Sequence, residues 1–320
     1  MSARPILAVG VLPPILSERL ERRYACHHIP DESGWSEALQ AIAPQIRAIA
    51  ATGESKVPRS LIGRLPNLEI ISVFGVGYDG VDAAAAHARG VVVTHTPDVL
   101  TDDVADFAFA LMLTTARTVL QADHFLRRGA WKAGPFPFAR RVSGQRLGII
   151  GLGRIGNAIA RRAEGFGMSI AYTNRAPVPG SAYRYVGDPV ALAAESDFLV
   201  LATPGGDNTR GLVGAAVLSA LGPDGILINV ARGSVVDEPA LVAALAEGRI
   251  AGAGLDVFVD EPAVPAALLE MTNVVLTPHV ASGTTATRHA MADLACDNLD
   301  AHFAGRPVPT PVPQTVRDAA

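Results

Sequence analysis

Short runs of aliphatic residues recur along the chain and alternate with amphipathic, helix-like segments such as Leu16–Tyr24 and Val81–Arg89. Most of the aliphatic runs are bounded by Gly, Pro or Asp, as the buried strands of parallel sheets are. This alternation predicts an α/β protein whose parallel strands are covered by helices. The expected strands are Ile6–Val9, Ala48–Thr52, Ile70–Val73, Val91–Thr94, Ile170–Thr173, Phe198–Ala202, Ile226–Val230, Gly254–Val257 and Val274–Leu276.

Two longer helices are predicted on either side of the middle of the chain. The first, Thr101–Arg128, has two aspartates in its first turn and two arginines in its last, which suits the helix dipole. The second is Thr284–Phe303. The proline-rich segment that follows it, Arg306–Pro313, is expected to be extended and to lie on the surface.

A glycine-rich turn joins the apolar strand Arg146–Ile150 to the amphipathic run Ile155–Ala163. In this order, Gly151 allows a sharp turn, Gly153 lets the backbone approach a pyrophosphate, and Gly156 lets the helix pack closely on the strand. The helix N-terminus then offers N–H groups and a partial positive charge to phosphates. The motif predicts a dinucleotide-binding site.

The end of the next strand indicates which dinucleotide binds. An NAD-binding fold usually has an acidic residue there, which binds the ribose 2′-OH. This chain has Asn174 followed by Arg175, so no carboxylate repels a 2′-phosphate and a guanidinium can bind it. We therefore expect NADP(H) to be preferred, with NAD(H) possible as a second cofactor. The alternative is that Arg175 is an ordinary solvated loop arginine.

The dinucleotide motif begins in the middle of the chain, between the two long helices. The simplest architecture is therefore a pair of α/β domains, one of them discontinuous. We expect residues 1–98 and 288–320 to form a substrate domain and residues 99–287 to form the dinucleotide-binding domain.

Composition and charge narrow the functional classes. Hydrophobic residues make up 49% of the 320 residues and charged residues 18%, which is typical of a compact globular protein. The net charge is −4 and no basic run occurs, so nucleic-acid binding is not expected. Cys26 and Cys296 have no metal-ligand spacing, which favours a metal-free protein in the reducing cytoplasm. The apolar segment Ile6–Leu16 is too short and too proline-rich to cross a bilayer.

Three polar residues follow strands of the second domain. Arg232, Glu261 and His279 each have an ordinary explanation alone, as a loop arginine, a first-turn charge and a turn cap. Ligands of open α/β sheets, however, bind beyond the carboxyl ends of the strands. Together the three supply a cation for a carboxylate or carbonyl, a histidine that moves a proton, and a carboxylate that holds the histidine.

Several strings, taken in order, resemble those of the D-2-hydroxyacid dehydrogenase family over nearly the whole chain. Asn174–Arg175 together with Trp131–Lys132 and Phe136–Phe138 is similar to the NADP-dependent glyoxylate/hydroxypyruvate reductase branch of that family. The strings that carry the resemblance are Phe74–Asp79, Gly148–Gly156, Asn229–Gly233, Gly254–Phe258, Asp260–Pro262 and Thr277–His279.

The resemblance implies two parallel-sheet domains, Rossmann-like and flavodoxin-like, with an active-site cleft between them. It implies that His279 is the general acid that protonates a 2-oxo acid, that Glu261 pairs with His279, and that Arg232 holds the substrate carboxylate. Backbone N–H groups of Val76 and Gly77 would bind the carboxylate from its other side.

The resemblance also implies the cofactor contacts and the assembly. A homodimer is expected, with the apolar stretch Phe107–Leu113 in its interface and Trp131 reaching the active site of the partner subunit; the alternative is that the aromatic residues of this loop only pack the dimer. The expected cofactor contacts are Thr101, Gly151, Gly153, Arg154, Ile155, Gly156, Asn174, Arg175, Thr203, Pro204, Val230, Ala231, Arg232, Asp256, His279 and Gly283. The alternative for Asp256 is a strand-end cap.

Two other functions stay open. A hydroxyphenylpyruvate reductase would use the same chemistry on an aromatic 2-oxo acid. A non-enzymatic protein that senses dinucleotides, similar to the C-terminal-binding-protein corepressors, would keep the fold and use cofactor occupancy to control association.

Overall fold

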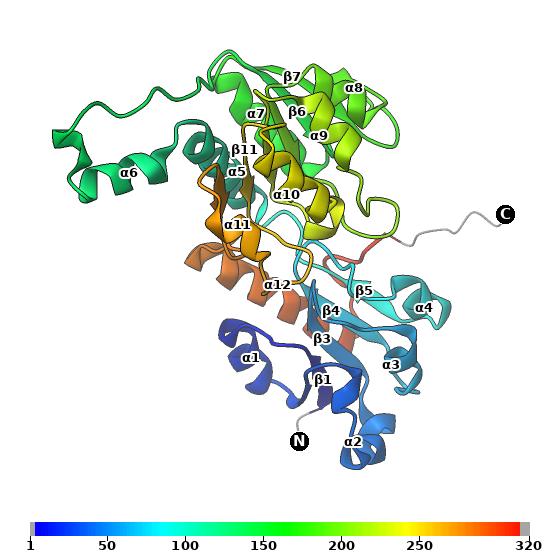
Figure 1. Ribbon diagram of the computed structural model, residues 1–320. Coiled ribbons are helices and arrows are strands. Elements are labelled where there is room, and N and C mark those ends of the chain that lie inside the picture. Colours follow the sequence, from blue (N-terminus) through cyan, green and yellow to red (C-terminus); the bar gives the residue numbers. More distant parts are fainter. Residues whose placement is uncertain (1–3, 314–320) are drawn as a thin grey trace. The chain divides into compact units, whose positions relative to one another are not determined.

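The computed structural model describes residues 4–313, which divide into two compact units (Figure 1). Unit 1 contains residues 4–100 and 284–313, and unit 2 contains residues 101–283. Residues 1–3 and 314–320, which the predicted substrate domain includes, lie outside the described residues. Both units are α/β with fully parallel sheets, so the predicted fold class is confirmed.

Unit 1 contains a five-stranded sheet in the order β2-β1-β3-β4-β5. This 2-1-3-4-5 order is that of flavodoxin-like sheets. The strands are β1 (Pro5–Val9), β2 (Ala25–Ile29), β3 (Ala48–Thr52), β4 (Ile70–Phe74) and β5 (Val92–Thr94), and the helices are α1 (Pro14–Glu21), α2 (Glu37–Ile42), α3 (Arg59–Gly63), α4 (Ala83–Ala88) and α12 (Thr285–Phe303).

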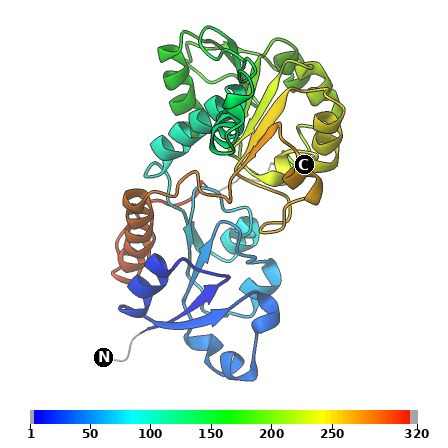
Figure 2. The ribbon, with the colours of Figure 1, turned by 60° about the vertical axis from the view of Figure 1, so that its left-hand side comes forward.

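Helices cover both faces of this sheet (Figure 2). Side chains alternate along each strand, so the two faces of β4 meet different partners. Ile71 and Val73 join the core beneath α2, α3 and α4, whereas the Ser72 hydroxyl donates to the Ala295 carbonyl of α12. The C-terminal helix therefore completes the fold of the N-terminal strands.

Strand β2 is absent from the sequence-based prediction. Its residues, Ala-Cys-His-His-Ile, are mostly polar or half-buried because β2 is an edge strand paired only with β1. An edge strand does not need the aliphatic run that identifies the central strands.

Unit 2 contains a seven-stranded sheet in the order β12-β11-β10-β9-β6-β7-β8. Counted from the first strand of the unit, six of these strands follow the 3-2-1-4-5-6 order of dinucleotide-binding sheets. The strands are β6 (Arg146–Ile150), β7 (Ser169–Thr173), β8 (Arg184–Tyr185), β9 (Phe198–Leu201), β10 (Ile226–Asn229), β11 (Gly252–Leu255) and β12 (Val274–Leu276), and the helices are α5 (Thr101–Ala116), α6 (Val119–Arg127), α7 (Arg154–Gly165), α8 (Pro189–Ala194), α9 (Ala215–Leu221), α10 (Glu238–Ala246) and α11 (Ala266–Glu270).

The predicted helix Thr101–Arg128 is wrong as a single helix, because the chain breaks between α5 and α6. Thr118 takes a left-handed conformation (φ 48°), and the Arg140 N–H donates to the Ala116 carbonyl where helix α5 ends. Helix-forming residues lie on both sides of the break, so only the returning loop reveals it. Helix α6 extends away from the unit-2 sheet (Figure 1).

Two further expectations need correction. Within Phe107–Leu113, the side chains of Ala108, Phe109, Leu111 and Met112 are buried in unit 2, and Phe109 packs against Phe166. These four belong to the core of unit 2, so only Phe107, Ala110 and Leu113, which are not buried, could take part in the expected interface. The proline-rich segment, expected on the surface, is mostly exposed, but Val312 is buried in the core of unit 1, where its N–H donates to the Val93 carbonyl.

Among the described residues, no helix is long and apolar enough to cross a membrane.

Candidate active site

Most of the predicted site residues lie at the carboxyl edge of the unit-2 sheet. Because all seven strands are parallel, the loops that follow them emerge at one edge. The order of the strands reverses between β6 and β9, which is where dinucleotides bind in this topology. The residues at this edge are Gly151 after β6, Asn174 after β7, Thr203 and Pro204 after β9, Val230–Arg232 after β10, Asp256 after β11 and His279 after β12.

The glycines of the β6–α7 turn have the geometry that the motif predicts. Gly151 has φ 101°, and a Cβ there would lie 2.7 Å from the Ala202 carbonyl carbon. A Cβ on Gly156 would lie 2.1 Å from the Gly151 oxygen, so helix and strand are in close contact. A Cβ on Gly153 would meet nothing within 4 Å among the described residues, and no side chain there caps α7. The turn is thus closely packed at Gly151 and Gly156 and leaves open space at Gly153, before the first turn of α7.

The side chain of Asn174 is part of this turn. Its Oδ1 accepts a 2.7 Å hydrogen bond from the Leu152 N–H, and its carbonyl accepts from the Tyr185 hydroxyl. Arg175, the next residue, is exposed. Asn174 therefore fixes the glycine turn and places an exposed guanidinium beside it.

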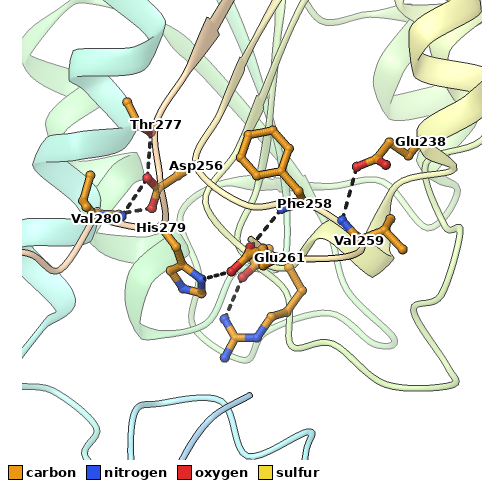
Figure 3. Close-up of polar contacts among 11 residues, drawn as sticks. Glu238, Asp256, Phe258, Val259, Glu261, Thr277, His279 and Val280 are labelled. Carbon is orange, nitrogen blue, oxygen red and sulfur yellow. Dashed lines mark hydrogen bonds and ion pairs between the residues drawn. The ribbon is translucent and has the colours of Figure 1, made fainter. Parts of the chain in front are cut away.

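His279 and Glu261 form a hydrogen-bonded pair beyond β12 and β11 (Figure 3). The His279 Nδ1 lies 2.7 Å from Glu261 Oε2, while Glu261 Oε1 accepts from the Phe258 N–H at 2.9 Å. Both side chains are partly exposed, 31% for His279 and 26% for Glu261. The predicted pairing of these two residues is thus seen directly.

The charge state of Glu261 determines which ring nitrogen carries the proton. Burial alone raises the pKa of the Glu261 carboxyl, but the hydrogen bond and charge of His279, the Phe258 N–H and the charge of Arg232 together hold that pKa below its ordinary value. An ionised carboxylate can only accept hydrogen bonds, so Nδ1 of His279 must donate. The Nε2 atom then remains as the site of proton exchange.

Asp256 holds the turn that carries His279. It is 1% exposed, and its carboxylate accepts hydrogen bonds from the Thr277 hydroxyl (2.7 Å), the Val280 N–H (2.9 Å) and the Ala281 N–H (2.8 Å). Its carbonyl accepts from the His279 N–H at 2.9 Å. His279 itself has φ 52°, a left-handed conformation that is uncommon for residues other than glycine. Asp256 therefore stabilises this backbone conformation of His279.

Arg232 follows β10 and is half-buried. Asn229 bridges the turn around it: its Oδ1 accepts from the Ala231 N–H and its Nδ2 donates to the Arg232 carbonyl. Nη1 of Arg232 donates to the Ala231 carbonyl at 2.8 Å. Arg232 thus has a fixed backbone beside the His279–Glu261 pair, and its charge lowers the pKa of Glu261.

The remaining predicted residues are distributed over both units. Thr101 begins α5, and its hydroxyl is buried with no hydrogen-bond partner among the described residues. Gly283 is the last residue of unit 2; it is exposed and donates its N–H to the Val280 carbonyl. Val76 and Gly77 belong to unit 1, in the loop after β4. Trp131 is 68% exposed in the segment after α6.

A family model for the NAD binding domain of D-isomer specific 2-hydroxyacid dehydrogenases matches residues 109–281. The chain belongs to the D-2-hydroxyacid dehydrogenase family. It is an oxidoreductase with an NAD(P)-binding domain, as the motifs predict.

Relatives match over nearly the full length. The chain is 47% identical to a hydroxyphenylpyruvate reductase of Plectranthus scutellarioides and 46% identical to a glyoxylate/hydroxypyruvate reductase of Arabidopsis thaliana, covering 98% of this chain and 100% of each relative. The structure is similar to the NADPH-dependent glyoxylate/hydroxypyruvate reductase of Sinorhizobium meliloti, solved in complex with NADP and malonate. That match has 49% identity, a TM-score of 0.91 and 97% coverage of both chains.

The residues of this dehydrogenase fit a dinucleotide at the β6–α7 turn. The open space before Gly153 and the uncapped start of α7 suit a polar, phosphate-bearing ligand. Sequence reasoning missed the supporting residues Asn229, Glu238 and the Phe258 N–H. Glu238, whose Oε1 accepts from the Val259 N–H at 3.2 Å, holds the loop before Glu261 (Figure 3). Nothing in the sequence pattern distinguishes such a residue from any other first-turn glutamate.

Proposed function

We propose that the enzyme reduces small 2-oxo acids, chiefly hydroxypyruvate and glyoxylate, to D-2-hydroxy acids with NADPH. The single observation that carries the proposal is the His279–Glu261 pair, held at 2.7 Å beside Arg232 at the carboxyl edge of a dinucleotide-binding sheet. An acid, its partner carboxylate and a carboxylate-binding cation are the groups that this reduction needs.

In the proposed reaction, His279 donates a proton from Nε2 to the carbonyl oxygen of the 2-oxo acid. Bound NADPH supplies the hydride for the adjacent carbon. The ionised Glu261 stabilises the protonated ring through Nδ1 and fixes its orientation. In the reverse direction, the neutral ring accepts the proton from the hydroxyl group of the 2-hydroxy acid.

Arg232 binds the substrate carboxylate in this proposal. A planar guanidinium can make two parallel hydrogen bonds to a carboxylate, which a lysine cannot do. The backbone N–H groups of Val76 and Gly77 are proposed as further carboxylate donors. Their loop follows β4, and hydrogen bonds from Thr96 and His95 to its Gly75 and Val76 peptide groups hold it.

The preference for NADPH rests on Asn174 and Arg175. No carboxylate stands at the end of β7, and the exposed guanidinium of Arg175 can pair with a 2′-phosphate. The Sinorhizobium meliloti relative is NADPH-dependent and was solved with NADP. The proposed dinucleotide contacts are the β6–α7 turn from Gly151 to Gly156, with Thr101, Thr203, Pro204, Val230, Ala231, Asp256 and Gly283.

A second substrate class is supported by one of the relatives. The hydroxyphenylpyruvate reductase of Plectranthus scutellarioides is as similar to this chain as the glyoxylate/hydroxypyruvate reductases are. An aromatic 2-oxo acid would use the same proton donor and the same carboxylate contacts, so hydroxyphenylpyruvate is the alternative substrate to test.

We also propose a homodimer in which Trp131 contributes to the partner's active site. Helix α6 has no buried residues, and Leu120, Leu126 and Trp131 on this extension are more than half exposed. Large exposed apolar side chains on one projecting element are typical of an association surface.

A cytoplasmic location is proposed on the chemistry of the two cysteines. Cys26 and Cys296 are free thiols, and burial raises the pKa of each to about 11. Unpaired thiols of this kind suit a reducing compartment.

The test is a matrix of initial rates with NADPH and NADH, each against hydroxypyruvate, glyoxylate, hydroxyphenylpyruvate and pyruvate. Turnover of the small 2-oxo acids with NADPH is expected. Faster turnover of hydroxyphenylpyruvate would favour the aromatic substrate class. Tight cofactor binding without turnover of any 2-oxo acid would contradict the proposal and favour a dinucleotide-sensing protein.

A further inference from the structure

The loop Gly75–Tyr78, which follows β4 in unit 1, is hydrogen-bonded to His95 and Thr96, the residues that follow β5. The Gly75 N–H donates to the Thr96 hydroxyl at 3.0 Å, and the Thr96 N–H donates to the Gly75 carbonyl at 2.8 Å. One residue further along, the His95 Nδ1 lies 2.9 Å from the Val76 carbonyl oxygen. Three hydrogen bonds thus join two neighbouring loops of the same unit.

The contact with Val76 defines the protonation of His95. A carbonyl oxygen can only accept, so the Nδ1 of His95 must carry the hydrogen. The residue is 9% exposed, and its ring packs edge-on against the Tyr78 ring with centroids 5.7 Å apart. His95 is therefore a buried donor with a fixed tautomer and a fixed ring orientation.

The Val76 carbonyl belongs to the same peptide unit as the Gly77 N–H. A trans peptide is planar and its C=O and N–H bonds point in opposite directions. Holding the carbonyl toward His95 therefore turns the Gly77 N–H to the opposite side of the loop. Without the Nδ1 donor, nothing in this set of contacts fixes the rotation of that peptide.

His95 is itself anchored to the C-terminal part of unit 1. Its N–H donates to the Thr310 carbonyl at 3.2 Å, and the Thr310 hydroxyl donates to the His95 carbonyl at 2.6 Å. Asn298 of α12, which is fully buried, accepts from the Thr310 N–H and donates to the Thr310 hydroxyl. The support of the loop thus runs from α12 through Thr310 to His95.

We propose that His95 is a positioning residue for the substrate carboxylate: its Nδ1–H holds the Val76 carbonyl, so that the Gly77 N–H is presented to the carboxylate. The inference rests on the proposed function, in which this loop binds a 2-oxo acid. It gives His95 a role in substrate affinity and none in proton transfer.

The test compares His95→Leu, which removes the donor, with His95→Asn, whose amide nitrogen occupies a position close to that of Nδ1. Each is assayed for KM and kcat with hydroxypyruvate at saturating NADPH, for inhibition by oxalate, and for NADPH affinity. For His95→Leu we expect KM and the oxalate Ki to rise about 10-fold, the effect of losing one well-placed hydrogen bond, while kcat and NADPH affinity change less than about 3-fold. His95→Asn should restore most of the lost affinity.

Thr310→Val provides a second variant if His95→Leu does not fold. It removes the hydroxyl that bonds the His95 carbonyl and leaves the imidazole in place, so KM should rise in the same direction by a smaller factor, about 3-fold.

Three results would overturn the inference: an unchanged KM in folded His95→Leu, a parallel loss of kcat and NADPH affinity, or equal KM increases in the Asn and Leu variants. The last two would indicate that His95 only packs the core. A wild-type enzyme that reduces no 2-oxo acid would instead refute the proposed function, and this inference with it.

Discussion

Two carboxylates act on His279 through different atoms. Glu261 accepts from the ring at Nδ1, whereas Asp256 accepts from the His279 N–H through its carbonyl and from the following N–H groups through its carboxylate. The first interaction determines the tautomer of the ring. The second holds a left-handed backbone that histidine seldom adopts. The tautomer of the ring and the backbone that carries it are thus fixed by separate contacts.

Glu261→Gln should change the pH dependence of reduction. In the proposed reaction His279 donates a proton, so reduction should slow as the ring loses that proton at higher pH. The Glu261 carboxylate lies 2.7 Å from Nδ1 and a negative charge at that distance stabilises a protonated ring, so removing it should move the decline of kcat/KM to lower pH. The measurement is kcat/KM for hydroxypyruvate from about pH 5 to 9.

Glu238→Gln is the matched control, because Glu238 accepts from the Val259 N–H, whereas Glu261 accepts from the neighbouring Phe258 N–H and pairs with the ring. Its profile should coincide with that of the wild type. A Glu261→Gln profile that coincided as well would separate Glu261 from the proton donor.

Asn174→Asp combined with Arg175→Ala should shift the cofactor preference toward NADH. The aspartate keeps an acceptor for the Leu152 N–H, so the glycine turn stays intact while a carboxylate now meets the ribose and the guanidinium is lost. The ratio of kcat/KM for NADPH to that for NADH should fall at least about 10-fold. An unchanged ratio would show that the 2′-phosphate is recognised elsewhere.

At the scale of single residues, the sequence was sufficient to place a reactive side chain where that side chain directly follows a predicted strand. Arg232 and His279 follow aliphatic strands, so their place at the carboxyl edge could be predicted. The network around Asp256 could not, because its donors come from Thr277, Val280 and Ala281, whose backbone conformation depends on the folded turn.

Among the elements, the β6–α7 turn contains one glycine that leaves space for a ligand and another that allows the helix to pack on the strand. Gly153 and Gly156 belong to one motif, yet an added methyl group would meet open space at the first and the Gly151 oxygen at 2.1 Å at the second. The same substitution therefore has different physical consequences at the two positions.

Gly153→Ala should keep the melting temperature within about 2 °C of the wild type while raising the NADPH Kd at least about 10-fold, because the methyl group occupies the space proposed for the pyrophosphate. Gly156→Ala should lower the unfolding free energy by about 1–3 kcal/mol through overpacking. Thermal melts and fluorescence titration with NADPH measure both quantities. Equal losses of stability in the two variants would contradict the assignment of separate roles.

Element boundaries were predictable where local patterns decide them. Helix α12 begins at Thr285 with Thr284 as its N-cap, one residue from the predicted start. The break between α5 and α6 was not predictable, because the Arg140 contact that closes it comes from a loop more than twenty residues away in sequence. The two-residue strand β8 likewise depends on its pairing with β7.

At the scale of the whole molecule, chain order and spatial order differ. The C-terminal helix α12 packs on the N-terminal sheet of unit 1, and Val312 joins its core, although the whole of unit 2 intervenes in sequence. The position of the glycine motif in mid-chain is the feature that indicated this arrangement. The proposed role of Trp131 depends on a second copy of the chain, so it has a test of its own.

Subunit mixing tests that role. In a heterodimer of one His279→Ala chain and one Trp131→Ala chain, a Trp131 that serves its partner leaves one active site intact, so activity should return. A Trp131 that serves its own chain leaves both sites defective. Coexpression with two different tags isolates the heterodimer, and light scattering reports its mass. A monomeric mass, or no recovery of activity, would refute the proposed arrangement.

His279 is the proposed proton donor of the reduction. The most direct test of this role is to measure the turnover of hydroxypyruvate with NADPH by wild type and His279→Ala. NADPH affinity should be titrated in the same preparations. We expect kcat to fall about 10²–10⁴-fold, the usual contribution of a positioned acid, with NADPH affinity little changed. Wild-type turnover by His279→Ala would remove His279 from the mechanism.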